Sequence, residues 1–267
     1  MAKESGSAPK LPKSLTLRHD GPIAILTLSR PEKRNALNDV LVEGFEEAFE
    51  TLPLSTKAVV LHAQGAHFSA GLDLSELELK TTEEGIAHSR SWHRVFEKIE
   101  FGRVPVVTVM HGAVVGGGLE LAAATHVRIA ERSTYYALPE GSRGIFVGGG
   151  GSVRIPRLIG VSRMMDLMLT GRTYGAEEGQ TYGLSHYLVD DGQGLAKGVE
   201  MAKRIATNSP TTNFAIINVL PRIAEQDRAS GYVMESLTAA IAQGNEEAKA
   251  RVKAFLEKRA AKVERSK

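Results

Sequence analysis

The chain of 267 residues contains no cysteine and a single tryptophan, and aromatic residues make up only 6% of it. The absence of cysteine excludes disulfide bonds, metal sites built on thiolates and a cysteine nucleophile. It fits a reducing compartment, so we expect a cytoplasmic protein. The sequence also lacks an apolar run long enough to span a membrane, and its polar N-terminus lacks the apolar segment of a signal peptide.

Neither sign of charge dominates the chain. It has 33 Lys and Arg residues against 31 Asp and Glu residues, a net charge of +2, and no basic stripe interleaved with aromatic residues. We therefore expect neither nucleic acid nor a membrane surface as a partner. With 42% hydrophobic and 24% charged residues, the composition is that of an ordinary globular protein, and the length favours one large domain, with or without an appendage.

The stretch VPVVTVMHGAVVGGGLELAAAT, residues 104–125, is the centre of the sequence. Val104–Met110 is a β-branched run that predicts a buried strand, and Leu119–Ala124 is built of strong helix formers. The glycines between them place backbone N–H groups at a helix N-terminus, where negative charge is favoured and a ligand can approach the main chain. We interpret the stretch as an anion-stabilising hole, with Glu120 as a carboxylate beside it.

A structural alternative exists for the same stretch. Glycine triplets often serve only to turn a strand into a helix, and an early helical glutamate is often only favourable charge placement. The glycines match neither a P-loop nor the dinucleotide fingerprint. Taken alone, this motif does not decide between a ligand site and a turn.

Hydrophobic periodicity predicts alternating strands and helices up to about residue 190. Ser14–Leu28 reads as a hairpin around Asp20-Gly21. Asn38 or Asp39 caps a predicted helix, and a second helix ends near Glu100. The apolar faces expected for these two helices are Val40, Leu41, Phe45 and Phe49, and Ile86, Trp92 or His93, Phe96 and Ile99. The other predicted strands are Ala58–His62, Val127–Ala130, Thr134–Ala137 and Leu184–Val189.

The later glycine-rich segment, residues 144–151, reads as a close-packed loop that enters a helix around Ile155–Leu158, and further helices are expected at Ser162–Thr170 and after Gly171–Gly179. From Gly194 onward the pattern is helical, with helices predicted at Leu195–Thr207, Pro210–Glu225, Tyr232–Gln243 and Glu246–Lys262. Strand-then-helix order implies an α/β fold with mostly parallel strands. We expect three regions: a disordered tail (1–13), an α/β core (14–193) and a helical region (194–267).

Four motifs in order resemble the crotonase, or enoyl-CoA hydratase/isomerase, superfamily. They are RPEKRNAL at 30–37, FSAGLDL at 68–74, the stretch from His111-Gly112 to Glu120, and Pro139-Glu140 with its trailing glycines. The resemblance runs from about Ser14 to Lys262. It implies a spiral of ββα turns that forms stacked sheets, a helical C-terminal region used in trimer assembly, and acyl-CoA substrates.

The resemblance also implies residue roles. The backbone N–H groups of Leu72 and Gly117 would hold the thioester oxygen as it becomes an enolate, and donors of this kind contribute about 3–4 kcal/mol each. Glu120 and Glu140 would grip one water and divide the acid and base work. Burial and like charge should push their pKa values apart. Outside the family context, the sequence favours the interpretation of Glu140 as a loop acid beside a turn-forming proline.

The coenzyme A moiety would lie near the first two motifs. Lys33 and Arg34 would meet its phosphates near the backbone of Ala36 and Ala70, although solvated surface charge is an equal alternative. The same resemblance places Asp73, Leu74 and Gly116 among the substrate-binding residues. Trp92 and His93 lie on the helix expected to cover the acyl chain, where plain core packing is as reasonable. No metal or separate cofactor is expected, since His62 and His67 flank a loop without ligand spacing. For His111, a structural role at the end of a strand is favoured over catalysis.

The sequence favours a hydratase that adds water across a 2,3-double bond, in a homotrimer or a hexamer built from two trimers. A double-bond isomerase and a non-catalytic protein of the same fold are the alternatives; two converging glutamates argue against the latter. Gly148 stands where some branches of the family carry a catalytic Asp, so the dienoyl isomerase and dehalogenase patterns are incomplete. Gly141, Arg143 and Val147 depart from the usual hydratase pattern, and so the acyl group is not predicted.

Overall fold

The computed structural model describes residues 9–77 and 81–257. The chain divides into two compact units, with the boundary between Ala206 and Thr207. Of the expected disordered tail, residues 1–8 lie outside the described residues, whereas Leu11 packs against the core and Pro12 lies against Gly44.

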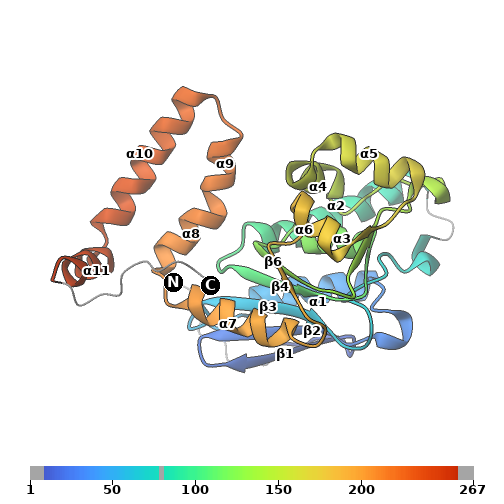
Figure 1. The fold of residues 1–267 in the computed structure, drawn as a ribbon, viewed down its shortest axis with the longest axis horizontal. Coiled ribbons are helices and arrows are strands. Elements are labelled where there is room, and N and C mark those ends of the chain that lie inside the picture. Colours follow the sequence, from blue (N-terminus) through green and yellow to red (C-terminus); the bar gives the residue numbers. More distant parts are fainter. Residues whose placement is uncertain (1–8, 78–80, 258–267) are drawn as a thin grey trace. The chain divides into compact units, whose positions relative to one another are not determined.

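A six-stranded sheet forms the centre of the first unit (Figure 1). Its strands, in spatial order, are β1 (Leu15–Asp20), β2 (Ile23–Leu28), β3 (Ala58–Ala63), β4 (Val106–Met110), β6 (Val127–Glu131) and β9 (Tyr187–Val189). β1 pairs with β2 as an antiparallel hairpin, and every later pairing is parallel. The predicted hairpin and the predicted parallel order are both confirmed.

One face of this sheet is covered by α7 (Gly194–Ala206). Ile23 and Ile25 point to this face, and the alternate residues of β2 point to the other. A Cβ at Gly198 would lie 2.6 Å from Cγ2 of Val109, so the glycine lets α7 approach the sheet closely. The unit boundary therefore differs from the one expected after residue 193, because the first helix of the expected helical region packs on the sheet of the core.

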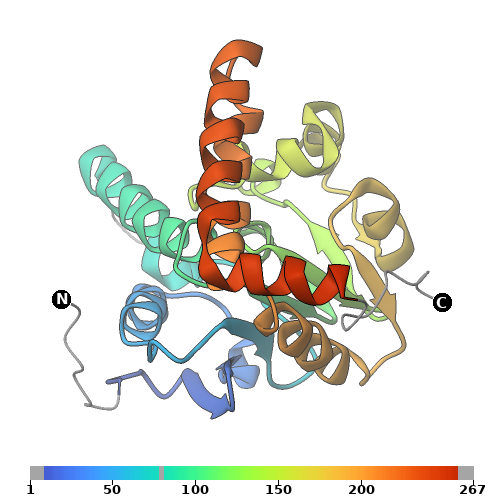
Figure 2. The same cartoon turned by 90° about the vertical axis from the view of Figure 1, so that its left-hand side faces the viewer.

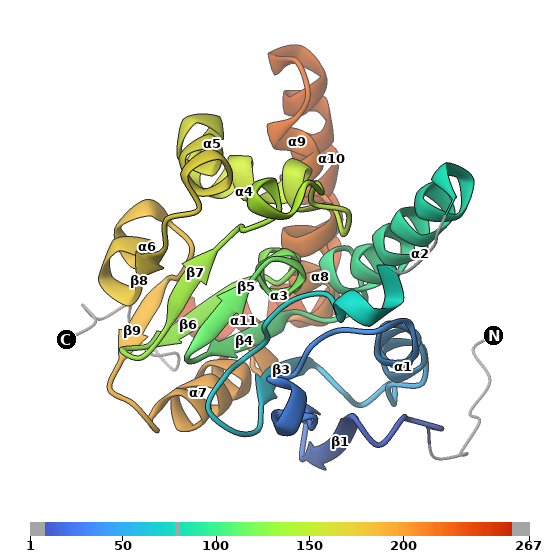
Figure 3. The same ribbon diagram turned by 90° about the vertical axis from the view of Figure 1, so that its right-hand side faces the viewer.

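The opposite face of the sheet carries the larger core and positions the site. The helices on this side include α1 (Asp39–Glu50), α2 (Thr82–Glu100) and α3 (Gly117–Ala123), and Figure 3 shows α3 between the small sheet and α2. The small sheet has the order β5 (Ala113–Val115), β7 (Tyr135–Ala137) and β8 (Tyr174–Gly175). β5 and β8 were not predicted, because β5 lies in the segment interpreted as a glycine turn and β8 lies in the turn predicted over Gly171–Gly179.

Side-chain caps fix the starts of α1 and α2. The side chain of Asn38 accepts the N–H of Leu41, and Thr81 forms a capping box with Glu84. The apolar faces are as predicted except at two positions: Val40 and Ile86 are 56% and 57% exposed. Val40 lies beyond the buried stripe of α1, and the buried residues of α2 begin only at Trp92.

The remaining helices of the first unit are α4 (Gly151–Ile159), α5 (Val161–Thr170) and α6 (Ala176–Tyr182), and short 3₁₀ turns occur at Pro31–Lys33, Leu74–Leu77 and Gly141–Arg143. These positions confirm the helices predicted around Ile155–Leu158 and at Ser162–Thr170, whereas α6 begins at Ala176, inside the turn predicted over Gly171–Gly179. The loop itself, residues 144–151, leads directly into α4.

The second unit consists of α8 (Pro210–Asn218), α9 (Leu220–Ala224), α10 (Arg228–Gly244) and α11 (Glu246–Leu256). The single helix predicted over Pro210–Glu225 is wrong, because Pro221 at the start of α9 interrupts it. Figure 2 shows α11, in red, crossing the end of α10. The end of the last predicted helix, residues 258–262, lies outside the described residues. Within the described part of the chain, no helix is both long and apolar enough to cross a bilayer.

Candidate active site

The glycine turn between β5 and α3 has a backbone that only glycine adopts easily. Gly116 has φ 51° and ψ −122°, and its N–H donates to the carbonyl of Ala137 at 2.9 Å. A Cβ at Gly116 would lie 2.7 Å from Oε1 of Glu140. The missing side chain therefore lets the Glu140 carboxylate lie directly against the turn.

Two backbone N–H groups meet at this turn. A Cβ at Gly117 would lie 3.4 Å from the nitrogen of Leu72, and a Cβ at Gly71 would lie 3.2 Å from the nitrogen of Gly117. Neither N–H, on Leu72 or on Gly117, donates to an acceptor within residues 9–77 and 81–257. The structure thus brings together the two N–H groups expected to form the oxyanion hole.

Pairing with Leu37 explains why the N–H of Leu72 is left open. The N–H of Leu37 donates to the carbonyl of Gly71 at 2.8 Å, and the N–H of Asp73 donates to the carbonyl of Leu37 at 2.7 Å. In an extended segment, successive N–H groups point to opposite sides. The N–H of Leu72 therefore points away from Leu37.

Glu120 lies in the first turn of α3 and is only 3% exposed. Its Oε1 accepts the N–H of Gly149 at 2.8 Å and the N–H of Gly151 at 2.7 Å. Burial raises the pKa of Glu120 to about 7, and the nearby Glu140 carboxylate raises it as well, while the two N–H donors oppose the shift. The group is poised to exchange a proton near neutral pH.

Glu140 follows β7 and is 6% exposed. Its Oε2 is buried without a hydrogen-bond partner in the described part of the chain, and burial raises the pKa of its carboxyl. Buried carboxylate oxygens are normally satisfied, so an open one indicates a place where a water or a ligand binds. The charge of Glu140 contributes to the raised pKa of Glu120, the residue with which Glu140 was predicted to pair.

The glycine-rich loop ahead of α4 is shaped around Glu120, and Arg154 holds it there. A Cβ at Gly151 would lie 2.7 Å from Cγ of Glu120. The guanidinium of Arg154 donates through Nη1 to the carbonyl of Gly149 at 3.0 Å and through Nε to Glu100 at 2.6 Å. Arg154 was not singled out from the sequence; the available signal was its position directly behind a glycine-rich loop, at the start of the predicted helix.

The first motif forms a tight loop joined to the segment that carries Leu72. Arg34 and Asn35 both have left-handed backbones, with φ 51° and 52°. The buried side chain of Asn35 accepts the N–H of Arg30 and donates to the carbonyls of Gln64 and His67. Sequence reasoning quoted Asn35 within the motif but gave it no role.

The residues expected to bind coenzyme A lie on these two joined loops. Lys33 is exposed, Ala36 and Ala70 are half-buried, and Leu74 is 44% exposed. Hydrogen bonds from Ser75, together with an ion pair to Arg30 at 2.8 Å, hold the pKa of Asp73 below its usual range. The carboxylate of Asp73 is therefore engaged within the protein.

The histidines have structural partners instead of a common ligand. His62 bonds the hydroxyl of Thr27, Nδ1 of His67 accepts the N–H of Ala113, and His111 bonds the carbonyl of Gly65. Within the described residues, no three His, Asp or Glu side chains gather as a metal site would require.

Comparisons with known proteins show the family to which the chain belongs. The sequence model of the family described as Enoyl-CoA hydratase/isomerase matches residues 18–266. A Bacillus subtilis protein described as a probable enoyl-CoA hydratase is 30% identical over 250 residues, which are 92% of this chain and 96% of that protein. A short-chain-enoyl-CoA hydratase of Clostridium acetobutylicum is 30% identical, over 92% of this chain and 95% of its own. A solved structure from Rhodopseudomonas palustris CGA009, provisionally called an enoyl-CoA hydratase, has a TM-score of 0.91 and 54% identity, and covers 97% of this chain and all of that one.

Proposed function

Because the chain belongs to the enoyl-CoA hydratase/isomerase (crotonase) family, we propose that it is a hydratase that adds water across the 2,3-double bond of an enoyl-CoA thioester. The observation that carries the proposal is the convergence of Glu120 and Glu140, two buried carboxyls, on a turn where the N–H groups of Leu72 and Gly117 are open. The names of the Bacillus and Clostridium relatives support the same activity.

The thioester oxygen would accept both open N–H groups, at Leu72 and Gly117. As water adds to C3, the electrons of the double bond shift through C2 toward this oxygen, and the negative charge that develops there is stabilised by donors already in place. The N-terminus of α3 adds a favourable dipole at the same point. The turn would therefore bind the transition state more tightly than the substrate.

The carboxyl pair would move the protons. One carboxylate takes a proton from the attacking water as the oxygen of that water bonds to C3, and the other carboxyl gives a proton to C2. The product is a 3-hydroxyacyl-CoA, and the pair returns to its starting protonation after one proton exchange with solvent. Because the nearby Glu140 carboxylate raises the pKa of Glu120, we assign the two roles to the pair as a whole.

The coenzyme A portion would lie along the joined loops. The exposed cation of Lys33 would meet its phosphates, and the backbones of Ala36 and Ala70 would face its nucleotide. Gly116 would give the thioester close access to the main chain. Asp73 would contribute by fixing the two loops through Arg30, and Leu74 would pack beside the pantetheine arm.

The test is a turnover screen. A panel of enoyl-CoA thioesters is followed by the loss of absorbance of the conjugated thioester, in wild type and in Glu120→Gln and Glu140→Gln. Both substitutions keep the side-chain volume and remove proton transfer, so each should lower hydration about 10²–10⁴-fold. The double variant should be little worse than the poorer single variant. Undiminished hydration by Glu140→Gln would contradict the two-carboxylate mechanism, and conversion without added water would indicate an isomerase.

We also propose that the protein assembles as a homotrimer or as a hexamer of two trimers through its helical C-terminal unit. Within that unit many large apolar side chains are exposed, among them Phe214, Leu237, Ile241, Val252 and Phe255. Exposed apolar surface of this extent is typical of an interface. Deletion of the residues after Gly244 should reduce the number of subunits per particle, as determined by light scattering. A truncated protein that keeps the full number of subunits would contradict the proposal.

A further inference from the structure

Trp92, the only tryptophan of the chain, lies against both halves of the candidate active site. A Cβ at Gly117 would lie 3.2 Å from Cζ3 of Trp92, and a Cβ at Gly149 would lie 3.2 Å from Cε3. Gly117 supplies an open N–H to the oxyanion hole, whereas the N–H of Gly149 holds Glu120. The six-membered edge of the indole therefore runs from the hole to the buried carboxylate.

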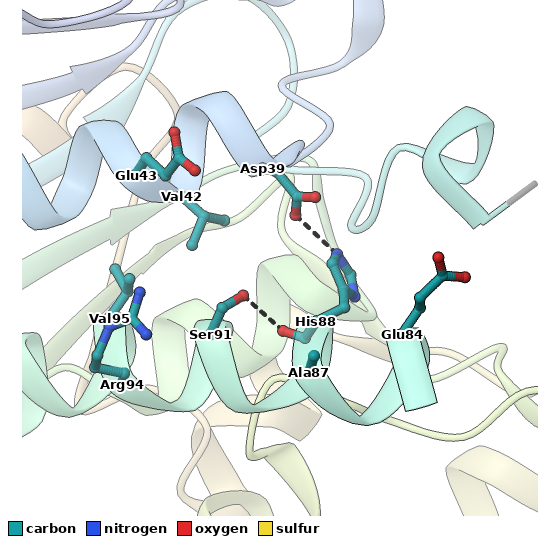
Figure 4. A pocket seen from close by; sticks show the side chains of 9 residues that line it. All are labelled: Asp39, Val42, Glu43, Glu84, Ala87, His88, Ser91, Arg94 and Val95. Carbon is teal, nitrogen blue, oxygen red and sulfur yellow. Dashed lines mark hydrogen bonds and ion pairs between the residues drawn. The ribbon is translucent and has the colours of Figure 1, made fainter. Parts of the chain in front are cut away.

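The indole is held from its other end by Asp39 and His88. Nε1 of Trp92 donates to Oδ1 of Asp39 at 3.2 Å, and Nε2 of His88 lies 2.8 Å from the same oxygen. Figure 4 shows His88 on α2 pointing toward Asp39 on α1, at a cavity of about 330 Å³ between the two helices. Phe96 lies one turn further along α2, and the centroid of its ring is 5.6 Å from that of the Trp92 ring.

Through Asp39, the Trp92 ring is connected to the segment that carries the N–H of Leu72. Asp39 begins α1, where a negative charge is favoured by the helix dipole. It follows Leu37 by two residues, and Leu37 pairs with the segment of Leu72. Trp92 is thus hydrogen-bonded to the helix that follows Leu37, while its ring lies beside Gly117, which carries the second N–H of the hole. A Trp ring confined by two glycines, Phe96 and a hydrogen bond has little freedom to move aside for a substrate.

From this placement we infer that Trp92 is a specificity-determining residue that restricts the substrate class to enoyl-CoA thioesters without a substituent on C2. The inference rests on the proposed hydration at this site. With the thioester oxygen at the N–H groups of Leu72 and Gly117 and the reacting carbons beside Glu120, the bond from C1 to C2 runs along the edge of the indole. A flat, unbranched enoyl group fits along that edge, whereas a methyl group on C2 would meet the ring.

The first test compares 2-butenoyl-CoA with 2-methyl-2-butenoyl-CoA in wild type and in Trp92→Ala and Trp92→Phe. Trp92→Ala should raise the ratio of kcat/KM for the branched over the unbranched thioester at least tenfold. Trp92→Phe is the safeguard against misfolding: it keeps a ring, loses the bond to Asp39, and should raise the ratio by a smaller factor. Ile86→Ala, at an exposed position of the same helix, is the matched control and should leave the ratio unchanged. An unchanged ratio in a folded Trp92→Ala protein that still hydrates 2-butenoyl-CoA would overturn the inference.

The second test does not depend on turnover. Because Trp92 is the only tryptophan, intrinsic fluorescence excited at the indole band reports on its surroundings alone. Saturation with butanoyl-CoA, an unreactive saturated thioester, should change the emission, and coenzyme A alone should have a much smaller effect. Binding of butanoyl-CoA detected by calorimetry without any change in emission would overturn the inference while leaving the proposed function standing. Failure of any acyl-CoA to bind would remove both.

Discussion

Oε1 of Glu120 accepts the backbone N–H of Gly151 at 2.7 Å, and a Cβ on Gly151 would come equally close to Cγ of the same glutamate. The carboxylate is thus held by the main chain of the loop that encloses it, and the loop has room for Glu120 only because a side chain is missing. By composition this glycine-rich segment resembles a flexible linker, but here its backbone N–H groups hold the side chain of Glu120.

Gly151→Ala should lower kcat for hydration by two orders of magnitude or more, since the added methyl must displace the Glu120 side chain. Binding of butanoyl-CoA should change only a few-fold. Gly148→Ala is the matched control in the same loop, because a Cβ there would find its nearest atom at 3.8 Å. Steady-state kinetics and calorimetry of the two variants check this. Equal activities of the two alanine variants would show that Gly151 does not position Glu120.

Glu120→Gln should change the pH dependence of stability. Burial raises the pKa of Glu120 from 4.5 to about 7, so the folded protein resists its ionisation, and the free energy of unfolding should fall as pH rises between these two values. The variant lacks this penalty. Its free energy of unfolding relative to wild type should therefore increase by about 1–3 kcal/mol from pH 4.5 to pH 8. Urea denaturation across this range measures the difference, with Glu97→Gln on the exposed side of α2 as the control for removing a charge. A constant difference would rule out the raised pKa.

Arg154→Gln should move the limb of the pH–rate profile that reports the ionisation of Glu120 to higher pH. The guanidinium lowers the pKa of Glu120 by its charge, so its removal lets that pKa rise further. The same change leaves Glu100 without its partner, which costs stability. The double variant Arg154→Gln with Glu100→Gln should recover stability and keep the displaced limb. If the limb returned to its wild-type position in the double variant, the effect would belong to Glu100 instead.

Asn35→Ala should destabilise the first unit by about 3–4 kcal/mol, because the three hydrogen bonds of the side chain are lost and alanine is strained at a left-handed backbone. Asn35→Gly loses the same bonds without the strain and should be about 1 kcal/mol less destabilising. Urea unfolding of both variants tests this. A glycine variant no better than alanine would show that the backbone of Asn35 carries no strain.

Local patterns in the sequence predicted much of the fold. The hairpin, the parallel strands and the start of α1 follow from periodicity and capping residues, which act over a few neighbouring positions. The short strands β5 and β8 were missed because they exist only through pairing with β7, and the break before α9 was missed because an apolar pattern continues through Pro221. Val40 and Ile86 were placed on buried faces because neighbouring apolar residues do not say how wide a buried stripe is.

The site was only partly readable in the same way. The order of the motifs pointed to Glu120, Glu140, Leu72 and Gly117, and the structure brings these four together. The groups that support them were not visible from the sequence. Arg154 donates a hydrogen bond to the carbonyl of Gly149, and Asp39 accepts one from Trp92, which is 53 positions away in the chain. Such contacts depend on tertiary placement, to which no local pattern corresponds.

The central claim is that this site adds water to an enoyl-CoA, and hydration in H₂¹⁸O tests it most directly. Wild-type protein incubated with 2-butenoyl-CoA should yield 3-hydroxybutanoyl-CoA with ¹⁸O at C3, detected by mass spectrometry. The labelled product should form at least a hundredfold more slowly with Glu120→Gln and with Glu140→Gln. A product that carries no ¹⁸O, or label entering at the wild-type rate in both variants, would contradict the account.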